Sequence, residues 1–403
     1  MNTDFAKEHA MSGPLQGLKI LDFTTLLPGP YATMALSDMG ADVLRIVSRS
    51  RPDVVAYIPP YVPGTEMSAA FTYLGRGKRC MTMNLKDSRA VRIVHQLIAD
   101  FDILIEQFRP GVMAKFGLDY LSLKKVNPSL IYCSLTGYGQ TGPLRDRAGH
   151  DINYLARSGI MSYSGKRESG PSLTGMQIAD IASGSNNAII GILAAVVCRN
   201  KTGKGQHIDI SMTDGMIAFN AMYGANFLVD GQDPVREKTL LNGGSLYDFY
   251  ETKDGEYLSV GSIEPQFFAA FCKTINCPDL IPGGIEPPDI ATVKQHVREI
   301  IKTKTRDEWM EEFRKVDACV EPVLSLSEAL KDIHARERGM VVEVGLPDGS
   351  KVRQLGSPIK FSETPPEYKN ACAPPGIHTK EVLLELGYSK EEIDEFEKTG
   401  MFD

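Results

Sequence analysis

Short runs of β-branched and aliphatic residues alternate with longer amphipathic stretches over the first two hundred residues of the chain. Residues 18–23 are typical of a buried strand, residues 31–39 follow a Pro-Gly-Pro turn as a helix, and residues 41–47 form the next strand. The alternation continues with helical patterns over 88–100, 180–198 and 213–228 and strand patterns over 102–106, 130–135 and 207–210. It predicts an α/β fold in which helices cover a parallel sheet.

The pattern changes near residue 229. A polar loop and a glycine pair lead into two short strand patterns around Lys253-Asp254-Gly255, a hairpin turn signal. Helical patterns then cover residues 265–275, 290–303, 306–315, 379–386 and 389–399, with strand-like runs returning after residue 335. We therefore expect a large domain of residues 1–228, completed by residues 335–403, and a small domain of residues 229–334. A chain of 403 residues exceeds what one hydrophobic core usually serves.

Composition and charge narrow the classes of function. Hydrophobic residues make up 42% of the chain and charged residues 24%, as in ordinary globular proteins, and the net charge is −7. Because an acidic chain is repelled by nucleic acid and by anionic membranes, we expect neither as a partner. The richest apolar run, residues 188–197, is shorter than the roughly 20 residues of a membrane span, so we expect a cytoplasmic protein. The seven cysteines form no CxxC pair, which favours reduced thiols over structural zinc.

Common cofactor signatures are missing from the sequence. Leu26-Leu27-Pro28-Gly29-Pro30 stands where a dinucleotide-binding chain would place GxGxxG, and neither a P-loop nor an HExxH pattern occurs. We therefore expect no nicotinamide, no prosthetic group and no bound metal.

Basic residues instead gather near strand ends. The three clusters are Arg45, Arg49 and Arg51; Arg76, Lys78 and Arg79; and Arg109 and Lys115, around Phe108-Arg109-Pro110-Gly111. One such cluster alone is usually a solvated surface. Three at corresponding strand ends of one sheet predict a site for a polyanionic ligand, because ligands bind beyond the carboxyl ends of such strands.

Three segments contain residues suited to proton transfer. His150 follows a glycine in a polar turn that opens onto an apolar segment, where a side chain can point into a cleft. Asp180 follows Ile178-Ala179 at the start of the long helix, and Glu264 stands between a strand pattern and a helix pattern. Each has an ordinary alternative: a structural histidine, a helix N-cap and a helix-start carboxylate.

A histidine with one carboxylate opposite it and another behind it suits proton exchange at a carbon acid, with a base on each face. A thioester supplies an acidic α-carbon. A coenzyme A carrier supplies the anion that the basic clusters would hold. Spacing along the chain leaves open whether these residues meet in space.

Motifs over nearly the whole chain resemble those of the family III CoA-transferase superfamily, of the CaiB/BaiF type. They include Gly17-Leu-Lys-Ile-Leu-Asp22, Ile105-Glu-Gln-Phe-Arg-Pro-Gly111, Thr136-Gly-Tyr-Gly-Gln-Thr-Gly-Pro143 and Asp317-Ala-Cys-Val-Glu-Pro-Val323. Three further motifs are similar to the alpha-methylacyl-CoA racemase branch of that family: Gly149-His-Asp-Ile-Asn-Tyr154, Ile178-Ala-Asp180 and Gly261-Ser-Ile-Glu-Pro-Gln-Phe267.

The resemblance implies a large Rossmann-like domain and a smaller α+β domain in an interlocked, ring-like homodimer, with Glu264 supplied by the partner chain. It implies that His150, oriented by Glu264, and Asp180 exchange the α-proton of an acyl-CoA through an enolate. Backbone N–H groups near Asp151 and at the helix start after Asp180 would stabilise the enolate oxygen. For CoA binding it implies Arg49, Lys78, Arg79, Phe108, Arg109, Lys115 and Asp151. Coenzyme A then enters as part of the thioester substrate.

Two reactions remain open within this resemblance. One is racemisation of a 2-methylacyl-CoA or a related acyl-CoA. The other is transfer of CoA between carboxylic acids, with Asp180 as the nucleophile of a mixed anhydride and then an aspartyl-CoA thioester. Such transferases generally lack the histidine, which favours racemisation. Met176, however, stands four residues before Asp180, where racemases of the family place asparagine, so the acyl group stays open.

Overall fold

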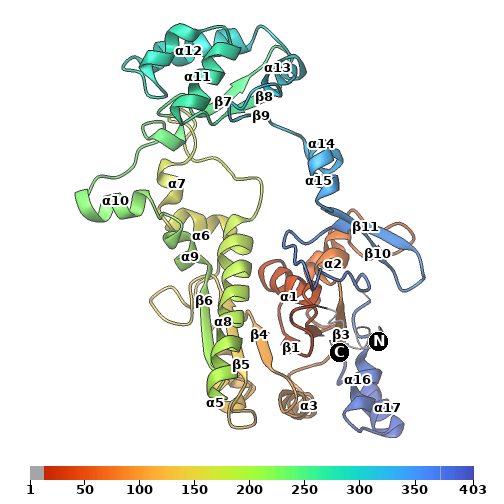
Figure 1. The fold of residues 1–403 in the computed structure, drawn as a ribbon. Coiled ribbons are helices and arrows are strands. Elements are labelled where there is room, and N and C mark those ends of the chain that lie inside the picture. The colour runs from red at the N-terminus through yellow and green to blue at the C-terminus, as the bar shows by residue number, and fades with distance from the viewer. Residues whose placement is uncertain (1–12, 373) are drawn as a thin grey trace, which may run out of the picture. The chain divides into compact units, whose positions relative to one another are not determined.

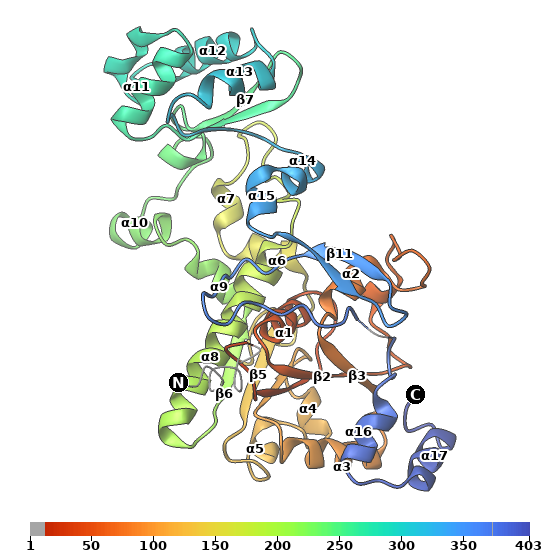
Figure 2. The same ribbon diagram turned by 45° about the vertical axis from the view of Figure 1, so that its right-hand side comes forward.

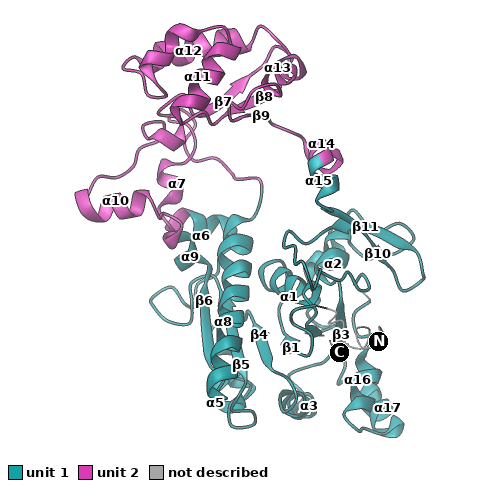
Figure 3. Ribbon diagram, viewed as in Figure 1, with its two compact units in different colours: residues 1–155, 176–216, 334–403 teal, residues 156–175, 217–333 magenta. Residues whose placement is uncertain are grey.

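The computed structural model describes residues 13–372 and 374–403, which divide into two compact units (Figure 3). The second unit consists of residues 156–175 and 217–333, and the first unit of the rest. The second unit therefore begins before the expected residue 229. The helix expected over 213–228 is broken at residues 219–222, and beyond the break Tyr223 packs edge-on against Tyr163 of the same unit.

Six parallel strands form the sheet of the first unit, in the order β3-β2-β1-β4-β5-β6 (Figure 1). The strands are β1 (Lys19–Asp22), β2 (Asp42–Val47), β3 (Lys78–Thr82), β4 (Ile103–Glu106), β5 (Ile131–Thr136) and β6 (His207–Ser211). This is the order of a doubly wound Rossmann-type sheet, in which the direction of winding reverses between β1 and β4. The predicted α/β fold with a parallel sheet is confirmed.

Helices cover both faces of this sheet. On one face Leu21, Leu44 and Leu104 belong to the main hydrophobic cluster, together with residues of α3, α16 and α17. On the other face α1 and α8 contact each other, and α8 lies along β5 and β6 (Figure 2). The helices with most or all of their residues in this unit are α1 (Pro28–Asp38), α2 (Ala69–Leu74), α3 (Ser88–Ile98), α4 (Val112–Lys115), α5 (Tyr120–Leu123), α6 (Asp151–Arg157), α8 (Asn186–Thr202), α9 (Met212–Ala218), α15 (Ile333–Glu337), α16 (Thr379–Glu385) and α17 (Lys390–Lys398). A hairpin of β10 (Val341–Gly345) and β11 (Lys351–Leu355) completes the unit.

A π-helical turn, η2 (Ala179–Ser185), runs directly into α8. The continuous helix Ala179–Thr202 has 24 residues and is long and apolar enough to cross a membrane, in contrast to the shorter run expected from the sequence. Core helices of soluble proteins have the same length and composition. In this unit the helix packs against α1, β5 and β6.

The second unit contains an antiparallel sheet of β7 (Asp248–Glu251), β8 (Tyr257–Val260) and β9 (Val320–Pro322). Helices α11 (Pro265–Thr274), α12 (Ile290–Ile301) and α13 (Arg306–Phe313) share a core with this sheet, centred on Tyr250, Phe271 and Trp309. Shorter helices are α7 (Ile160–Tyr163), α10 (Tyr223–Asp230) and α14 (Leu326–Lys331). The hairpin and the three long helices expected here are all present.

Candidate active site

A cleft of about 340 Å³ lies at the carboxyl ends of β1, β4, β5 and β6. Its walls are the segments that follow these strands: Leu26 and Pro28 after β1, residues 107–110 after β4, residues 136–138 at the end of β5, and Met212 after β6. Because β1 and β4 flank the point where the winding of the sheet reverses, this is where such a sheet binds its ligands.

His150 lines this cleft from the turn before α6. Its backbone carbonyl accepts hydrogen bonds from the N–H groups of Asn153 and Tyr154, so His150 occupies the helix start, and its side chain is exposed. The preceding Gly149 is required by close packing, because a Cβ there would lie 2.7 Å from the Tyr154 ring. The Tyr154 hydroxyl donates to the Gly149 carbonyl at 2.5 Å and thereby fixes the turn that presents His150.

Asp180 lines the same cleft from the first turn of η2. The N-cap of this turn is Ile178, so the alternative of Asp180 as a helix N-cap is wrong. Small residues allow η2 to lie close to its neighbours: the Ser183 hydroxyl donates to the Met212 carbonyl at 2.6 Å, and the Ser185 hydroxyl donates to the Pro28 carbonyl at 2.7 Å. Single π-helical turns are frequent at functional sites.

The carboxylate of Asp151 holds the start of η2. Its Oδ1 accepts hydrogen bonds from the N–H groups of Ala179 at 2.6 Å and Asp180 at 3.1 Å. The next N–H, that of Ile181, donates to the Gln177 carbonyl. The N–H groups at this helix start are therefore already bonded, and the expectation that they stabilise an enolate oxygen is wrong.

Burial and the neighbouring negative charge of Asp151 together raise the pKa of Asp180 to about 6, although His150 acts in the opposite direction. A carboxyl group with this pKa is present in both protonation states near neutral pH. It is therefore suited both to accept and to donate a proton, as a general acid–base group must.

Glu264 lies in the second unit, at the N-cap of α11 after β8, where the sequence places it. Its position agrees with the alternative of a helix-start carboxylate, although among the described residues its exposed side chain makes no capping hydrogen bond to α11. Its role toward His150 stays a prediction.

The cations of the cleft are Arg109, Arg145 and Arg147, and Phe108 lies beside Arg109 in the segment after β4. Arg109 and Phe108 were expected from the sequence. Arg145 and Arg147 were not, because they stand in an irregular loop without periodic signal; their one hint is their position just before Gly149-His150. Two polar atoms in this cleft, Gln107 Oε1 and Thr136 Oγ1, are buried and have no hydrogen-bond partner in the described part of the chain, which fits a site for a polar ligand.

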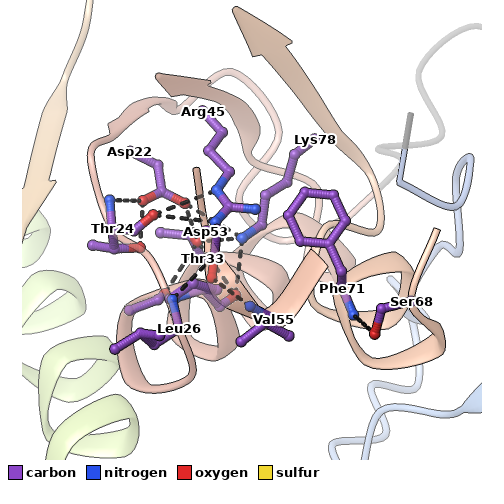
Figure 4. A network of polar contacts seen from close by, with 12 residues as sticks. Asp22, Thr24, Leu26, Thr33, Arg45, Asp53, Val55, Ser68, Phe71 and Lys78 are labelled. Carbon is purple, nitrogen blue, oxygen red and sulfur yellow. Dashed lines mark hydrogen bonds and ion pairs between the residues drawn. The ribbon is translucent and has the colours of Figure 1, made fainter. Parts of the chain in front are cut away.

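Lys78 and Arg45 belong to a buried network of charges (Figure 4). The Lys78 ammonium donates to Thr33 Oγ1 at 2.6 Å and to the Pro30 carbonyl at 2.9 Å, and lies 3.3 Å from Asp22 Oδ2. Arg45 pairs with Asp53 at 2.5 Å. Burial lowers the pKa of Lys78 to about 8, against the attraction of Asp22. The expected contact of Lys78 with a CoA phosphate is therefore wrong in this structure, because its side chain is enclosed and paired.

The three basic clusters also fail to share one edge of the sheet. Arg45 lies within β2, and Lys78 and Arg79 open β3, with Lys78 opposite Val43 in the parallel register. They therefore lie away from the carboxyl edge, which Arg109 follows. The expectation of three clusters at corresponding strand ends was therefore wrong. The cluster with Lys78 and Arg79 lies at the amino end of β3, whereas Arg109 follows the carboxyl end of β4.

The remaining cations expected at the CoA site lie outside the lining of the cleft. The Arg79 guanidinium lies 2.9 Å from Glu385 and 3.4 Å from Asp42, so its charge is already balanced by carboxylates. Arg49 follows β2, and Lys115 is the last residue of α4; both are exposed.

Comparison with known proteins shows which family this chain belongs to. The chain matches CoA-transferase family III over residues 15–379. It is 35% identical to alpha-methylacyl-CoA racemase of Homo sapiens, over 94% of this chain and 95% of that protein. It is 34% identical to succinyl-CoA:glutarate CoA-transferase of Mus musculus, over 97% of this chain and 90% of that protein. Among solved structures, a CAIB/BAIF family protein from Brucella suis is similar with a TM-score of 0.82 and 30% identity, over 93% of this chain and 100% of that one.

Proposed function

Because this chain belongs to CoA-transferase family III, we propose that it is an enzyme that racemises the α-carbon of a 2-methylacyl-CoA or a related acyl-CoA thioester. The observation that best supports this reaction is the presence of His150 and Asp180 at one cleft. Both reach it from helix starts that side-chain hydrogen bonds hold in place, from Asp151 at η2 and from Tyr154 at α6. Two proton-transfer groups beside one ligand site are what inversion of a carbon acid requires.

In the proposed reaction, one of the two residues removes the α-proton, and the electron pair of the C–H bond moves into an enolate. The other residue gives a proton to the opposite face of the α-carbon, so its configuration inverts. The pKa of about 6 suits Asp180 to both roles, depending on the direction. For the enolate oxygen we propose the backbone N–H of Asp151 as the donor, because the N–H groups at the start of η2 bond elsewhere.

We propose that Arg109 and Phe108 hold the CoA part of the substrate, with Arg145 and Arg147 as further cations of the same cleft. Exposed Arg49 and Lys115 are proposed as contacts for the outer phosphates. Glu264 is proposed to orient His150 from the small domain of the partner in an interlocked homodimer.

The second candidate is transfer of CoA between two carboxylic acids, which the similarity to succinyl-CoA:glutarate CoA-transferase favours. Asp180 would attack the thioester carbonyl and release the CoA thiolate, forming an anhydride. The thiolate would then attack the Asp180 carbonyl and release the first carboxylate. This reaction requires a second carboxylic acid, whereas racemisation requires none.

Proton NMR of (2S)-2-methylacyl-CoA in deuterated water separates the two reactions. We expect α-deuteration and loss of optical purity without an added carboxylic acid. If the α-proton stays in place and CoA appears on an added acid instead, racemisation is excluded and Asp180 acts as a nucleophile.

A further inference from the structure

Glu106 is a buried acid that the proposed reaction does not use. It is the last residue of β4, only 4% exposed, and it stands opposite Ser134 of β5 in the parallel register. Ser134 in turn stands opposite Asp209 of β6, so the three side chains share one face of the sheet. The Ser134 hydroxyl lies 3.0 Å from His207 Nε2.

The carboxylate of Glu106 reaches the wall of the cleft through one backbone contact. Its Oε2 accepts a hydrogen bond from the N–H of Phe108 at 2.8 Å. Phe108 and the adjacent Arg109 line the cleft. A bond from this N–H to a charged carboxylate is roughly twice as strong as one to a neutral oxygen, so the charge state of Glu106 determines how firmly this segment is held.

A second, smaller cavity of about 70 Å³ lies behind the same segment. Glu106, Ser134 and His207 line it together with Arg109, which lines both cavities. Its volume is sufficient for water, which gives Glu106 a route for gaining and losing a proton.

Burial raises the pKa of Glu106 to about 7, although the Ser134 hydroxyl and the Phe108 N–H favour its charged form. The negative charge of Asp209 acts in the same direction as burial. The titratable and charged groups around Glu106 are Asp209 and His207 of β6, Tyr132 and Cys133 of β5, Arg109 of the cleft wall, and Asp119 and Tyr120 at the start of α5. Within the described residues, no salt bridge of 4.0 Å or less joins Glu106 to a cation. Its charge state can therefore change near neutral pH.

We propose that Glu106 is a positioning residue for CoA binding: its ionised carboxylate holds Phe108 and Arg109 at the cleft wall, so that CoA binds more tightly once Glu106 has lost its proton. The inference rests on the proposed function only for the identity of the ligand.

Calorimetric binding of free coenzyme A at about pH 6 and pH 8 tests this role in Glu106→Gln. Glutamine keeps an oxygen for the Phe108 N–H but carries no charge. At the higher pH we expect the variant to bind CoA about three- to tenfold more weakly than the unchanged protein, and at the lower pH within about twofold. The phosphate of CoA also titrates near pH 6, but it is common to both proteins, so their difference isolates Glu106.

Two further variants sharpen the test. Asp119→Asn removes an acid that lines the same small cavity but bonds to Ser122, and it should follow the unchanged protein at both pH values. Ser134→Ala removes a hydrogen bond that favours ionised Glu106, so it should move the rise in CoA affinity to higher pH. Equal weakening of Glu106→Gln at both pH values, or no weakening at either, would overturn the inference and leave the proposed function standing. Failure of the unchanged protein to bind CoA at either pH would overturn both.

Discussion

Two groups of charged side chains lie on the same parallel sheet and differ in whether their charges are paired. Near β1, β2 and β3, Lys78 and Arg45 are buried against Asp22 and Asp53. At the carboxyl ends of β4 to β6, by contrast, His150, Asp180 and Arg109 open onto a cleft, and within the described residues none of them forms an ion pair of 4.0 Å or less. The buried, paired side chains are closed to ligands, whereas the side chains at the cleft can interact with a bound ligand.

The closed group nevertheless shapes the open one. Asp53, which pairs with Arg45, also accepts the backbone N–H of Leu26 at 3.1 Å. Leu26 has a φ of 63°, a strained conformation for leucine, and it forms part of the cleft wall. Paired charges thus fix backbone geometry beside the site, while unpaired ones are available for chemistry. The difference can be tested by removing one member of each group.

The largest effect is expected for Asp180→Asn. The amide keeps the size of the side chain but cannot take the α-proton, so α-deuterium exchange should fall about 10²- to 10⁴-fold. CoA affinity, measured by calorimetry, should stay within about twofold of the unchanged protein. The matched control is Asp146→Asn, an exposed acid in the loop before His150, which should keep the full rate. A variant of Asp180 that keeps most of the exchange rate would remove it from the reaction.

In the buried group, Lys78→Met should lower the free energy of unfolding and leave CoA binding unchanged. The methionine leaves Asp22 buried without its ammonium partner, and loss of one member of a buried pair costs about 3–5 kcal/mol of the free energy of unfolding. Urea denaturation measures this loss, with exposed Lys86→Met as the control. CoA affinity of the folded variant should be unchanged. A stable variant with weak CoA binding would instead place Lys78 at the phosphates.

A smaller effect, on pH dependence alone, is expected for Asp151→Asn. The amide oxygen can still accept the N–H groups of Ala179 and Asp180, but the negative charge that helps to raise the pKa of Asp180 is gone. In the unchanged protein the exchange rate should rise with pH through about 6, as Asp180 becomes an ionised base. In the variant this rise should move to lower pH. Exchange rates between about pH 5 and 8 measure the shift, and an unmoved profile would show that Asp151 acts only through its hydrogen bonds.

Strands β1, β4 and β5 could be predicted closely from the sequence because they are short, mostly apolar runs that are buried on both faces, whereas β6 is partly exposed. The expected strand at 130–135, for example, corresponds to β5 at Ile131–Thr136. The expected helix over 213–228 was less accurate. Its apolar pattern continues across residues 219–222, where the structure breaks into α9 and α10. Hydrophobic periodicity shows which residues are apolar. Because α9 and α10 are both rich in apolar residues, the periodicity does not show where one helix ends and the next begins.

The candidate site divides in the same way. His150 and Asp180 could be found because each stands beside a local signal, a glycine turn and a helix start, and these signals act over a few residues. The role of Lys78 could not, since its partner Asp22 lies 56 residues away and only the parallel pairing of β1, β2 and β3 brings the two together. A sequence shows where charges are, whereas pairing across strands determines which of them are neutralised.

Arg79 is intermediate between the two groups, and Arg79→Gln should have the smallest effect. Its side chain is 26% exposed, and its guanidinium faces Glu385, Asp42 and Glu381 at the surface. Ion pairs of this kind contribute little, so the free energy of unfolding should fall by less than about 1 kcal/mol, and by less still in high salt. CoA affinity should not change, because the charge of Arg79 is balanced and its side chain does not line the cleft. A variant that keeps its stability but loses CoA affinity would contradict this expectation. Arg79 would then leave its carboxylate partners and bind a phosphate when CoA binds. Paired charges at this edge of the sheet would in that case also be available to a ligand.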